Sequence, residues 1–459
     1  MQKTIRHGSR TGTLTVPASK SWAHRMLITA ALSKDACEMY CDGISKDIAA
    51  TTECLNGLGA EIRFPQTESK DDVIRINPIN MAETGVDANG IECLGEYSVL
   101  KCGESGSTLR FLLPVVGALG AKAVFLMEGR LSERPMGPLV DELRRHGMDI
   151  RQDGKYLYCS GKLQAGDYNI PGNISSQYIS GLLLALPILD GDSRIVISGT
   201  IESADYIEMT ERAVKNAGIV FDKNDQIYNI EGKQNYSCPK VMVVEKDWSS
   251  ASFPLCMGAF SEEGIAVTGL NIESGQGDKE ILNVLKGFGA EVSLDPDAGK
   301  YVKGYCKKDC EPSVNKPGGS FVRSSITVRK GYLKGQIVDA SGIPDLVPVI
   351  CVLGAGAIGD TRIVHAERLR FKESDRIMTT LTMLKSLGAD AEETEDGLII
   401  HGTGRLKGGI TESFKDHRIA MSAAVAAGIC EGDVIVKDAE CTDKSFPGFW
   451  DVLETLDIV

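Results

Sequence analysis

The chain has 459 residues, of which 42% are hydrophobic, and this is enough for two or three domains that each bury a core. Its net charge of −13 argues against nucleic acid as the main partner, because a phosphate backbone needs a broad basic face. The start of the chain lacks the apolar core of a signal peptide, and no apolar run reaches the length of a membrane span, so neither feature is expected.

One pattern recurs along the chain: an amphipathic helix that ends at a glycine and runs into a strand. Each glycine stands where a helix end needs a positive φ, and β-prone residues follow it. The five glycines are Gly59, Gly147, Gly218, Gly289 and Gly388. A degenerate sixth copy spans residues 451–458. The pattern predicts six βα units of roughly 75 residues each, which divide into two domains of three.

The predicted domain boundaries lie where the chain passes from one half to the other. One crossing is expected near residues 244–247, where a strand meets a turn, and a second near 17–19. The first strand would then belong with the C-terminal half. The predicted domains are residues 19–245 and residues 1–18 plus 246–459.

In the N-terminal half, predicted helices begin with cations, hydroxyls or glycine. Lys20, Ser21 and Arg25 lie in the first turns of a helix predicted over 20–32. A cation opposes the positive end of the helix dipole, so this helix start is a plausible anion site. Residues 103–114 form a glycine-bearing turn that enters a second helix.

Two further helix starts follow along the chain. Arg130 and Arg134 precede a helix that Pro135 begins, and residues 173–180 start another helix with small hydroxyls and an amide. Helix capping alone would explain this serine cluster and the similar one at 247–252, which opens the second half.

The basic segment 300–334 carries nine Lys or Arg against two acids, with prolines and glycines, and is interpreted as a solvated loop or hairpin insert. Cys306 and Cys310 within it could supply half of a zinc site, but no second half lies nearby, so no metal is expected. The thirteen cysteines are dispersed and form no CxxC pair, which favours reduced thiols in a cytoplasm.

Residues 354–359 match the dinucleotide fingerprint GxGxxG, but the match is rejected. A Pro-initiated helix from Ile343 is predicted before it, and a strand from Thr361 is predicted after it. Nucleotide binding needs the reverse order, in which a strand is followed by a helix.

The densest charged segment is 368–376, which reads Arg-Leu-Arg-Phe-Lys-Glu-Ser-Asp-Arg. A solvated helix could look like this. Other short segments throughout the chain, however, also pair a cation with Ser, Gln, Asp or Gly. They include a helix start at 416–421, where His417 is interpreted as a capping residue, and a turn that presents Lys444. Because the chain is acidic overall, this repetition indicates a small ligand with several negative charges.

Taken in order, these segments cover essentially the whole chain and resemble the EPSP synthases (3-phosphoshikimate 1-carboxyvinyltransferases) of the enolpyruvyl transferase family. Each string is weak alone, and their common order makes the resemblance specific. The strings are SKSxxxR at 19–25, GxSGSTxR at 103–110, RxxERP at 130–135, SSQY at 175–178, DxSSAS at 247–252, IPD at 343–345, KESDR at 372–376, DHRxAM at 416–421 and KSFP at 444–447.

The resemblance implies an α/β (α+β) fold of two similar domains, each built from three βαβαββ units in an inverse α/β-barrel-like arrangement, with a cleft between them. It implies that phosphoenolpyruvate and shikimate 3-phosphate react by addition and elimination to 5-enolpyruvylshikimate 3-phosphate and phosphate. This reaction belongs to the shikimate pathway to chorismate and the aromatic amino acids. No cofactor, metal, nucleic acid or membrane would take part, and a cytoplasmic monomer is expected.

The resemblance also implies roles for individual residues. Asp345 would be the base at the 5-hydroxyl, and Glu373 would be the acid toward the methylene carbon. Lys20 and Lys444 would stabilise charge on phosphoenolpyruvate, and either could share the proton transfer. Shikimate 3-phosphate would contact Lys20, Ser21, Arg25, Ser175, Ser176, Ser203, Asp345 and Lys372. Phosphoenolpyruvate would contact Lys20, Gly106, Arg130, Gln177, Arg376, Arg418 and Lys444.

The chain departs from the usual pattern of this family at Glu104, Ser105 and Arg368. The acid at Glu104 could weaken phosphoenolpyruvate binding unless Arg110 or Arg130 pairs with it.

Two other functions stay open at this point. One is that of the sister transferase acting on UDP-N-acetylglucosamine, whose loop cysteine is replaced here by Ser320. The other is a non-catalytic anion-binding protein that kept the fold, which would not depend on Asp345 and Glu373 for turnover.

Overall fold

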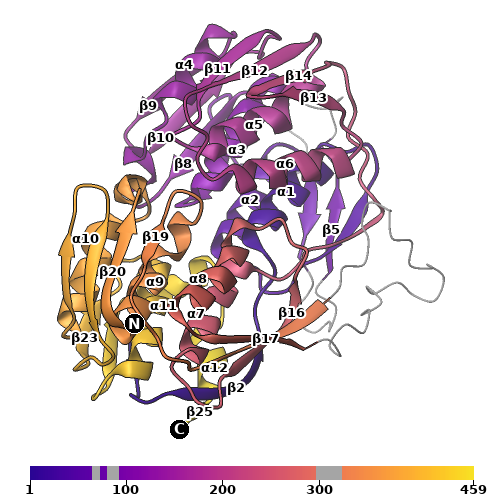
Figure 1. Ribbon diagram of the computed structural model, residues 1–459. Coiled ribbons are helices and arrows are strands. Elements are labelled where there is room, and N and C mark those ends of the chain that lie inside the picture. Colours follow the sequence, from indigo (N-terminus) through magenta and orange to yellow (C-terminus); the bar gives the residue numbers. More distant parts are fainter. Residues whose placement is uncertain (65–72, 80–91, 296–322) are drawn as a thin grey trace, which may run out of the picture. The chain divides into compact units, whose positions relative to one another are not determined.

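The computed structural model describes residues 1–64, 73–79, 92–295 and 323–459 (Figure 1). These residues form two compact units. The N-terminal unit is Lys20–Val244, and the C-terminal unit combines Met1–Ser19 with the described residues of 245–459. Most of the predicted basic insert, with Cys306, Cys310 and Ser320, lies outside the described residues. Within the described ranges, no helix has the length and apolar character that crossing a membrane requires.

The repeated helix, glycine and strand are confirmed in all five copies. The glycines Gly59, Gly147, Gly218, Gly289 and Gly388 have φ values of 97°, 98°, 81°, 97° and 92°, a region that favours glycine. The helices before them are α2 (Lys46–Gly57), α4 (Gly137–Arg145), α6 (Ala204–Asn216), α8 (Ile281–Phe288) and α10 (Arg376–Ser386). The strands after them are β4 (Glu61–Arg63), β9 (Asp149–Asp153), β13 (Phe221–Asn224), β17 (Glu291–Asp295) and β21 (Asp390–Glu393). The degenerate sixth copy forms α12 (Phe449–Glu454) and β25 (Asp457–Ile458).

Three stretches follow the order strand, helix, strand, helix, strand, strand without interruption. In each stretch the first two strands are parallel, and the last two form an antiparallel pair. The first contains β7 (Tyr97–Gly103), α3 (Gly106–Leu119), β8 (Ala123–Met127), α4, β9 and β10 (Tyr156–Ser160). The second contains β11 (Asp167–Pro171), α5 (Ser176–Ala185), β12 (Ser193–Ser198), α6, β13 and β14 (Ile227–Ile230). The third contains β19 (Ile337–Asp339), α9 (Val347–Gly356), β20 (Ile358–Val364), α10, β21 and β22 (Leu398–Thr403).

Two other sheets take a parallel strand from a distant part of the chain. In the C-terminal unit, β2 (Arg10–Thr15) pairs with β16 (Ile265–Asn271), which continues to β18 (Arg323–Arg329) and β17. In the N-terminal unit, β15 (Val241–Val243) pairs with β3 (Cys37–Tyr40), which continues to β5 (Val73–Asn77) and β4. The remaining strands are β1 (Gln2–Ile5), β24 (Val434–Lys437) and β23 (Gly409–Glu412), which form one sheet, and β6 (Cys93–Leu94), which extends the sheet of β7.

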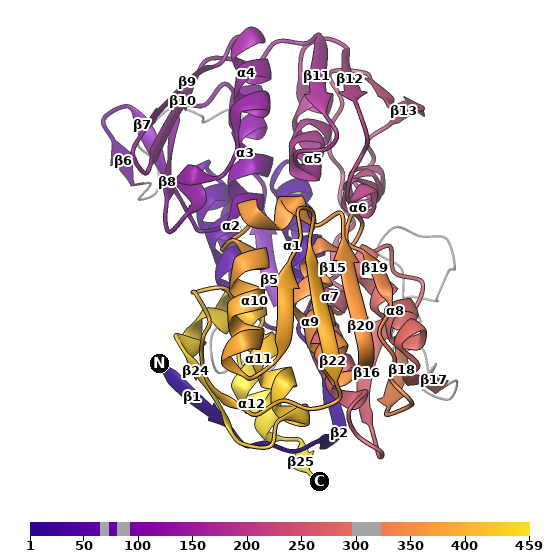
Figure 2. The ribbon, with the colours of Figure 1, turned by 60° about the vertical axis from the view of Figure 1, so that its left-hand side comes forward.

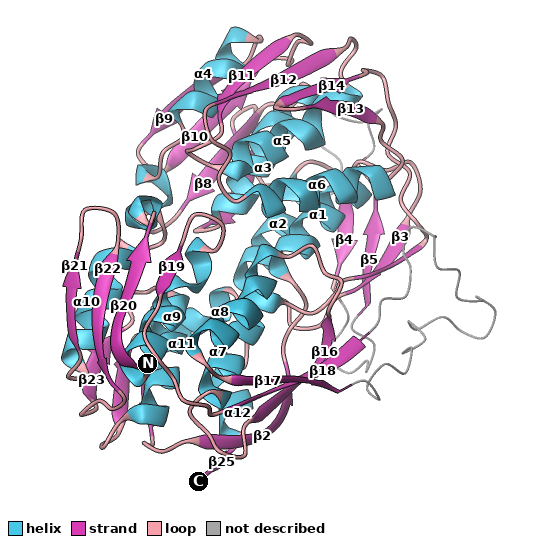
Figure 3. Cartoon of the chain, viewed as in Figure 1, coloured by secondary structure: helices cyan, strands magenta, loops and turns pink. Residues whose placement is uncertain are grey.

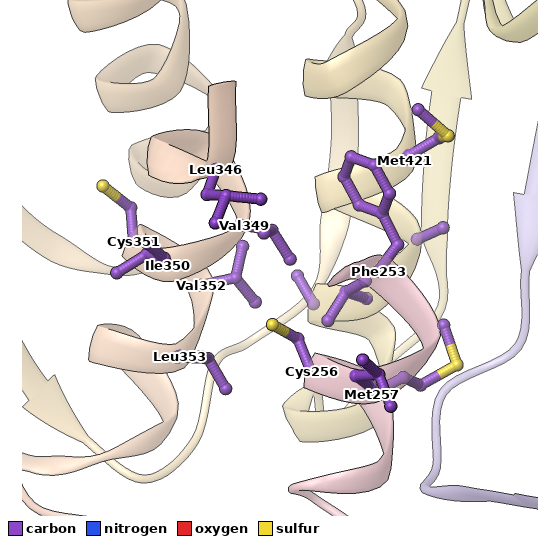
Figure 4. Close-up of a cluster of buried hydrophobic side chains, with 14 of the residues drawn as sticks. Phe253, Cys256, Met257, Leu346, Val349, Ile350, Cys351, Val352, Leu353 and Met421 are labelled. Carbon is purple, nitrogen blue, oxygen red and sulfur yellow. The ribbon is translucent and has the colours of Figure 1, made fainter. Parts of the chain in front are cut away.

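The core of each unit is formed by helices that the sheets cover. In the C-terminal unit, α7 (Trp248–Gly258), α9 and α11 (His417–Ala426) pack on one another, between the sheet of β19–β22 and the sheet that contains β2 and β16 (Figure 3). Val349 and Val352 of α9 point toward Phe253 and Cys256 of α7 (Figure 4). These helices are apolar on nearly all sides, which suits full burial.

In the N-terminal unit, α1 (Lys20–Ala31), α3 and α5 are largely buried. Helix α3 packs on α5, while α6 contacts both α5 and α1. Figure 2 shows α3 between α5 and the strands β7 and β8.

Two predictions made from the sequence are corrected by the structure, and a third is confirmed. Helix α4 begins at Gly137 rather than at Pro135. Pro138 lies in its first turn, where a proline is tolerated because the N–H that it lacks would have no partner within the helix. Lys444 is not presented by an open turn. It ends the 3₁₀ helix η8 (Ala439–Lys444), which packs on α11, and it is only 6% exposed. The rejection of the nucleotide fingerprint is confirmed, since α9 ends at Gly356 and the strand β20 follows it.

Candidate active site

A cluster of charged side chains surrounds Asp345 in the C-terminal unit. Asp345 lies in the 3₁₀ turn η5 (Pro344–Leu346), directly before α9. Its Oδ1 accepts from Lys372 Nζ at 3.3 Å and from Arg376 Nη1 at 2.7 Å. Arg418 Nη2 lies 3.1 Å from the second oxygen, and Arg418 Nη1 donates to the backbone carbonyl of Asp345 at 2.8 Å. Three cations therefore converge on one carboxylate.

Arg376 connects this carboxylate to two others. It opens α10 and is only 1% exposed. Its Nη2 donates to Glu373 Oε2 at 2.7 Å, and its Nε donates to Asp416 Oδ2 at 2.8 Å. A buried guanidinium needs such partners, because an unpaired buried charge is strongly unfavourable. The charge run 368–376 is thus not a solvated helix.

The charges in this cluster shift one another's protonation. Burial alone would raise the pKa of Asp345, but Arg418, Lys372 and Arg376 outweigh it and hold that pKa well below its usual value. Burial lowers the pKa of Lys372 to about 8, against the opposing effect of Asp345. At neutral pH, Asp345 is a carboxylate and can accept a proton, while Lys372 is largely an ammonium that can donate one.

The start of α11 holds Arg418 in place. Asp416, rather than His417 as predicted, caps this helix and accepts from the backbone N–H of Arg418 at 3.0 Å, while His417 is the first residue of the helix. Ser249, in the first turn of α7, accepts from Arg418 Nη2 at 2.7 Å. Sequence reasoning did not assign a role to Asp416 or Ser249. A signal was present for Asp416, because an aspartate directly before a helix start is a preferred cap.

In the N-terminal unit, the first turns of α1 are tied to neighbouring helices. Lys20 Nζ lies 2.9 Å from Asp47 Oδ2 of α2. Arg25 is nearly fully buried and donates to the backbone carbonyls of Ser21 at 2.7 Å and Tyr206 at 2.6 Å. Burial lowers the pKa of Arg25 to about 9. Asp47 was not found from the sequence, because its contact with Lys20 joins two different helices.

Gln177 belongs to a second group in the N-terminal unit. Ser175 caps α5 and accepts from the backbone N–H of Gln177 at 3.3 Å. The Gln177 side chain accepts from Arg110 Nη1 at 2.8 Å and donates to Ser107 Oγ at 2.9 Å. Ser176 is the first residue of α5 and is buried.

The other predicted residues of this unit occupy helix starts or turns. Gly106 is the first residue of α3, and an added Cβ there would lie 2.8 Å from Arg134 Nη1, so a side chain would displace this arginine. Arg130 precedes the 3₁₀ turn η1 (Leu131–Glu133) and is exposed. Ser203 occupies the position before the first residue of α6 with a positive φ of 55°, and its side chain makes no capping hydrogen bond to the helix.

The structure therefore brings Asp345, Lys372, Glu373, Arg376 and Arg418 together through direct contacts. Lys444 is buried in the same unit, at the end of η8. The N-terminal candidates form local groups around α1, α3 and α5. Within the described residues, no group of three or more His, Cys, Asp or Glu could hold a metal ion.

A family model described as EPSP synthase (3-phosphoshikimate 1-carboxyvinyltransferase) matches residues 6–453. A 3-phosphoshikimate 1-carboxyvinyltransferase of Clostridium perfringens is 38% identical over 448 residues, which cover 97% of this chain and 96% of the relative. One of Brachyspira hyodysenteriae is 37% identical, with the same coverage.

Solved structures agree with the sequence matches. The EPSP synthase of Acinetobacter baumannii aligns with a TM-score of 0.76 at 25% identity, over 100% of this chain and 99% of that one. The enolpyruvyl transferase NikO of Streptomyces tendae aligns with a TM-score of 0.74 over 100% and 98% of the two chains, and at 15% identity it shows the fold alone. The predicted mixed α/β enolpyruvyl transferase fold is confirmed. The chain belongs to the EPSP synthase family, the 3-phosphoshikimate 1-carboxyvinyltransferases.

Proposed function

We propose that the chain carries out the family's reaction with Asp345 as its base. The enolpyruvyl group of phosphoenolpyruvate is transferred to the 5-hydroxyl of shikimate 3-phosphate, a step of the shikimate pathway. The observation that carries the assignment of the base is the convergence of Lys372, Arg376 and Arg418 on the Asp345 carboxylate. These three cations can also bind the phosphate and carboxylate groups of the substrates.

The chemistry needs a base and an acid that each work twice. In the addition, the 5-hydroxyl loses its proton to Asp345 while its oxygen bonds to C2 of phosphoenolpyruvate, and the methylene carbon C3 gains a proton. In the elimination, the new methyl group gives its proton back to the acid, Asp345 passes its proton to the leaving phosphate, and the C2–O bond to phosphate breaks. No net proton, electron or oxidant is consumed inside the site.

The low pKa of Asp345 fits this role once the substrates are bound. In the free protein the cations hold this carboxylate strongly acidic, which makes it a weak base. Anionic substrates share the charge of Lys372, Arg376 and Arg418, so substrate binding raises the pKa of Asp345 and strengthens the base. Nη1 of Arg376 carries two hydrogens, so it can contact Asp345 and a substrate oxygen together.

We assign the proton donated to C3 to Glu373, which lies next to Lys372 and 2.7 Å from Arg376 Nη2. Lys20 and Lys444 stabilise charge on phosphoenolpyruvate. In this proposal shikimate 3-phosphate contacts Lys20, Ser21, Arg25, Ser175, Ser176, Ser203, Asp345 and Lys372. Phosphoenolpyruvate contacts Lys20, Gly106, Arg130, Gln177, Arg376, Arg418 and Lys444.

The experiment that tests the function is an assay of phosphate release from phosphoenolpyruvate by the purified chain. Release is expected with shikimate 3-phosphate and not with UDP-N-acetylglucosamine as the acceptor. Release with the nucleotide sugar alone would assign the chain to the sister transferase, and no release with either acceptor would favour a non-catalytic anion-binding protein.

A further inference from the structure

Arg25 is a buried cation of the N-terminal unit that is held by uncharged groups. It is only 2% exposed. Its Nη atoms donate to the carbonyls of Ser21 at 2.7 Å and Tyr206 at 2.6 Å, and its Nε donates to Thr210 Oγ1 at 2.7 Å. Its Cζ lies 5.0 Å from the centre of the Phe111 ring. The guanidinium thus lies among neutral oxygens and an aromatic ring, and none of these contacts is with a carboxylate.

Arg376 of the C-terminal unit is buried to a similar extent but has a different environment. It is 1% exposed, and it forms ion pairs with Asp345, Glu373 and Asp416. Such partners are needed because the removal of a charge from water is costly. For Arg25 this cost is visible in the pKa, which burial lowers to about 9. A bound anion would supply the negative charge that the contacts of Arg25 lack.

The hydrogen bonds of Arg25 do not use all of its donors. A guanidinium has five N–H hydrogens, and each of the three nitrogens of Arg25 uses one in the contacts above. One hydrogen therefore remains on each Nη. Bidentate pairing with a carboxylate or a phosphate needs two such hydrogens on two nitrogens.

Thr210 holds the guanidinium from helix α6. A guanidinium can only donate, so the Thr210 oxygen accepts from Arg25 and the single hydroxyl hydrogen must point elsewhere. Two acceptors lie within its reach, which are Ser180 Oγ of α5 at 2.8 Å and the Tyr206 carbonyl at 3.2 Å. Thr210 and Ser180 are fully buried, and α6 packs on both α1 and α5. Packing and hydrogen bonds on both sides thus determine where the Thr210 oxygen lies.

We propose that Thr210 is a positioning residue for the transferase reaction: its hydroxyl fixes the Arg25 guanidinium for shikimate 3-phosphate without neutralising the charge. This inference rests on the proposed function, in which Arg25 binds this substrate. A carboxylate at position 210 would also hold the guanidinium, but it would compete with the anionic groups of the substrate. A neutral oxygen gives Arg25 a defined position and keeps its positive charge available to the ligand.

The test compares Thr210→Val with Thr52→Val, the same substitution at another buried threonine of the N-terminal unit. Within the described residues, the Thr52 hydroxyl has no hydrogen-bond partner, so this control should match the wild type in both KM values. Thr210→Val is expected to raise the KM for shikimate 3-phosphate about tenfold, the effect of one lost hydrogen bond to a charged group. The KM for phosphoenolpyruvate should stay unchanged. Thr210→Ser keeps the hydroxyl and should stay close to the wild type.

Thr210→Asp separates positioning from a structural role. The new carboxylate should pair with Arg25, so the Tm at pH 7.5 should be higher than that of Thr210→Val, which leaves the Arg25 Nε–H without its acceptor. The KM for shikimate 3-phosphate should nevertheless rise further in Thr210→Asp, because a neutralised guanidinium attracts an anion less strongly. A purely structural role predicts the opposite order, in which the more stable variant has the lower KM.

An unchanged KM for shikimate 3-phosphate in Thr210→Val would overturn the inference, and so would equal rises in both KM values. If that variant does not fold, Thr210→Asp decides, because a wild-type KM for shikimate 3-phosphate there excludes a need for a neutral acceptor. Arg25→Lys distinguishes the two proposals. It must raise the KM for shikimate 3-phosphate if Arg25 binds this substrate, whatever Thr210 does.

Discussion

At Asp345, one carboxylate contacts three cations, and these contacts explain its acidity and are the basis of the anion binding that we propose. Lys372, Arg376 and Arg418 hold the carboxylate ionised, and they are the groups that a phosphate or carboxylate ligand would contact. Removing the Asp345 charge should therefore affect turnover and stability together.

Asp345→Asn should lower kcat by about 10²-fold or more, the usual contribution of a general base. The pKa of Asp345 is lowered in the folded chain, so its carboxylate contributes stability above its ordinary pKa, and the Tm at pH 7.5 should fall as well. The measurement is phosphate release at a temperature where circular dichroism shows a folded variant. Asp339→Asn, which removes an exposed carboxylate at the end of β19, is the control. Unchanged turnover in Asp345→Asn would exclude this residue as the base.

Lys372 should produce an alkaline limb in the pH profile. Its pKa is lowered to about 8 by burial, so the ammonium is lost as pH rises through that value. We expect kcat/KM to fall above about pH 8 in the wild type. Lys372→Arg should remove this limb, because arginine stays charged throughout the range. A variant profile that keeps the limb would assign it to another group.

At the scale of elements, the same left-handed backbone conformation is required at five helix ends. The glycine after each helix has a positive φ, and the next strand begins within three residues. The space available for a side chain at the glycine differs between the copies. At Gly59 an added Cβ would meet no atom within 4 Å, whereas at Gly147 it would lie 2.9 Å from the carbonyl oxygen of Lys162.

This difference gives a matched pair of substitutions in one unit, at φ values of 97° and 98°. Gly59→Ala should destabilise the chain by about 1 kcal/mol, the strain of a left-handed backbone for a residue with a Cβ. Gly147→Ala should destabilise it more, because the backbone must also move away from the Lys162 oxygen. Tm values from calorimetry compare the two. Equal decreases in Tm would mean that the contact between the new Cβ at position 147 and the Lys162 oxygen is relieved without strain.

At the scale of the whole molecule, ligand binding should be visible as stability. The predicted domains, 19–245 and 1–18 plus 246–459, remain our proposal for the folding units, beside the compact division at Ser19 and Val244. Any ligand that binds only the folded chain stabilises it by mass action.

Shikimate 3-phosphate at 100 times its Kd should therefore stabilise the chain by about 2.7 kcal/mol, which raises the Tm. Shikimate without its phosphate, at the same concentration, should stabilise it much less, because the proposed contacts of Lys20 and Arg25 are to an anion. Differential scanning fluorimetry makes the comparison. Equal stabilisation by the two compounds would contradict the proposed phosphate contacts.

The repeat, its helix ends and the family follow from the amino-acid sequence alone. These features are local: a glycine with positive φ, a capping aspartate and a short string of residues depend on neighbours a few positions away. The same locality explains two wrong details. A proline marks a helix start only to within a few positions, and a run of turn-forming residues around Lys444 does not reveal that its helical turn packs on α11.

Which charges meet depends on the tertiary structure. Asp345 and Arg418 are 73 residues apart, and Arg25 and Tyr206 are 181 residues apart, yet both pairs are in direct contact. Asp47 carries no sequence signal, because its significance comes from its buried contact with Lys20. Contacts across such separations depend on how sheets and helices pack, and packing is a property of the folded chain as a whole.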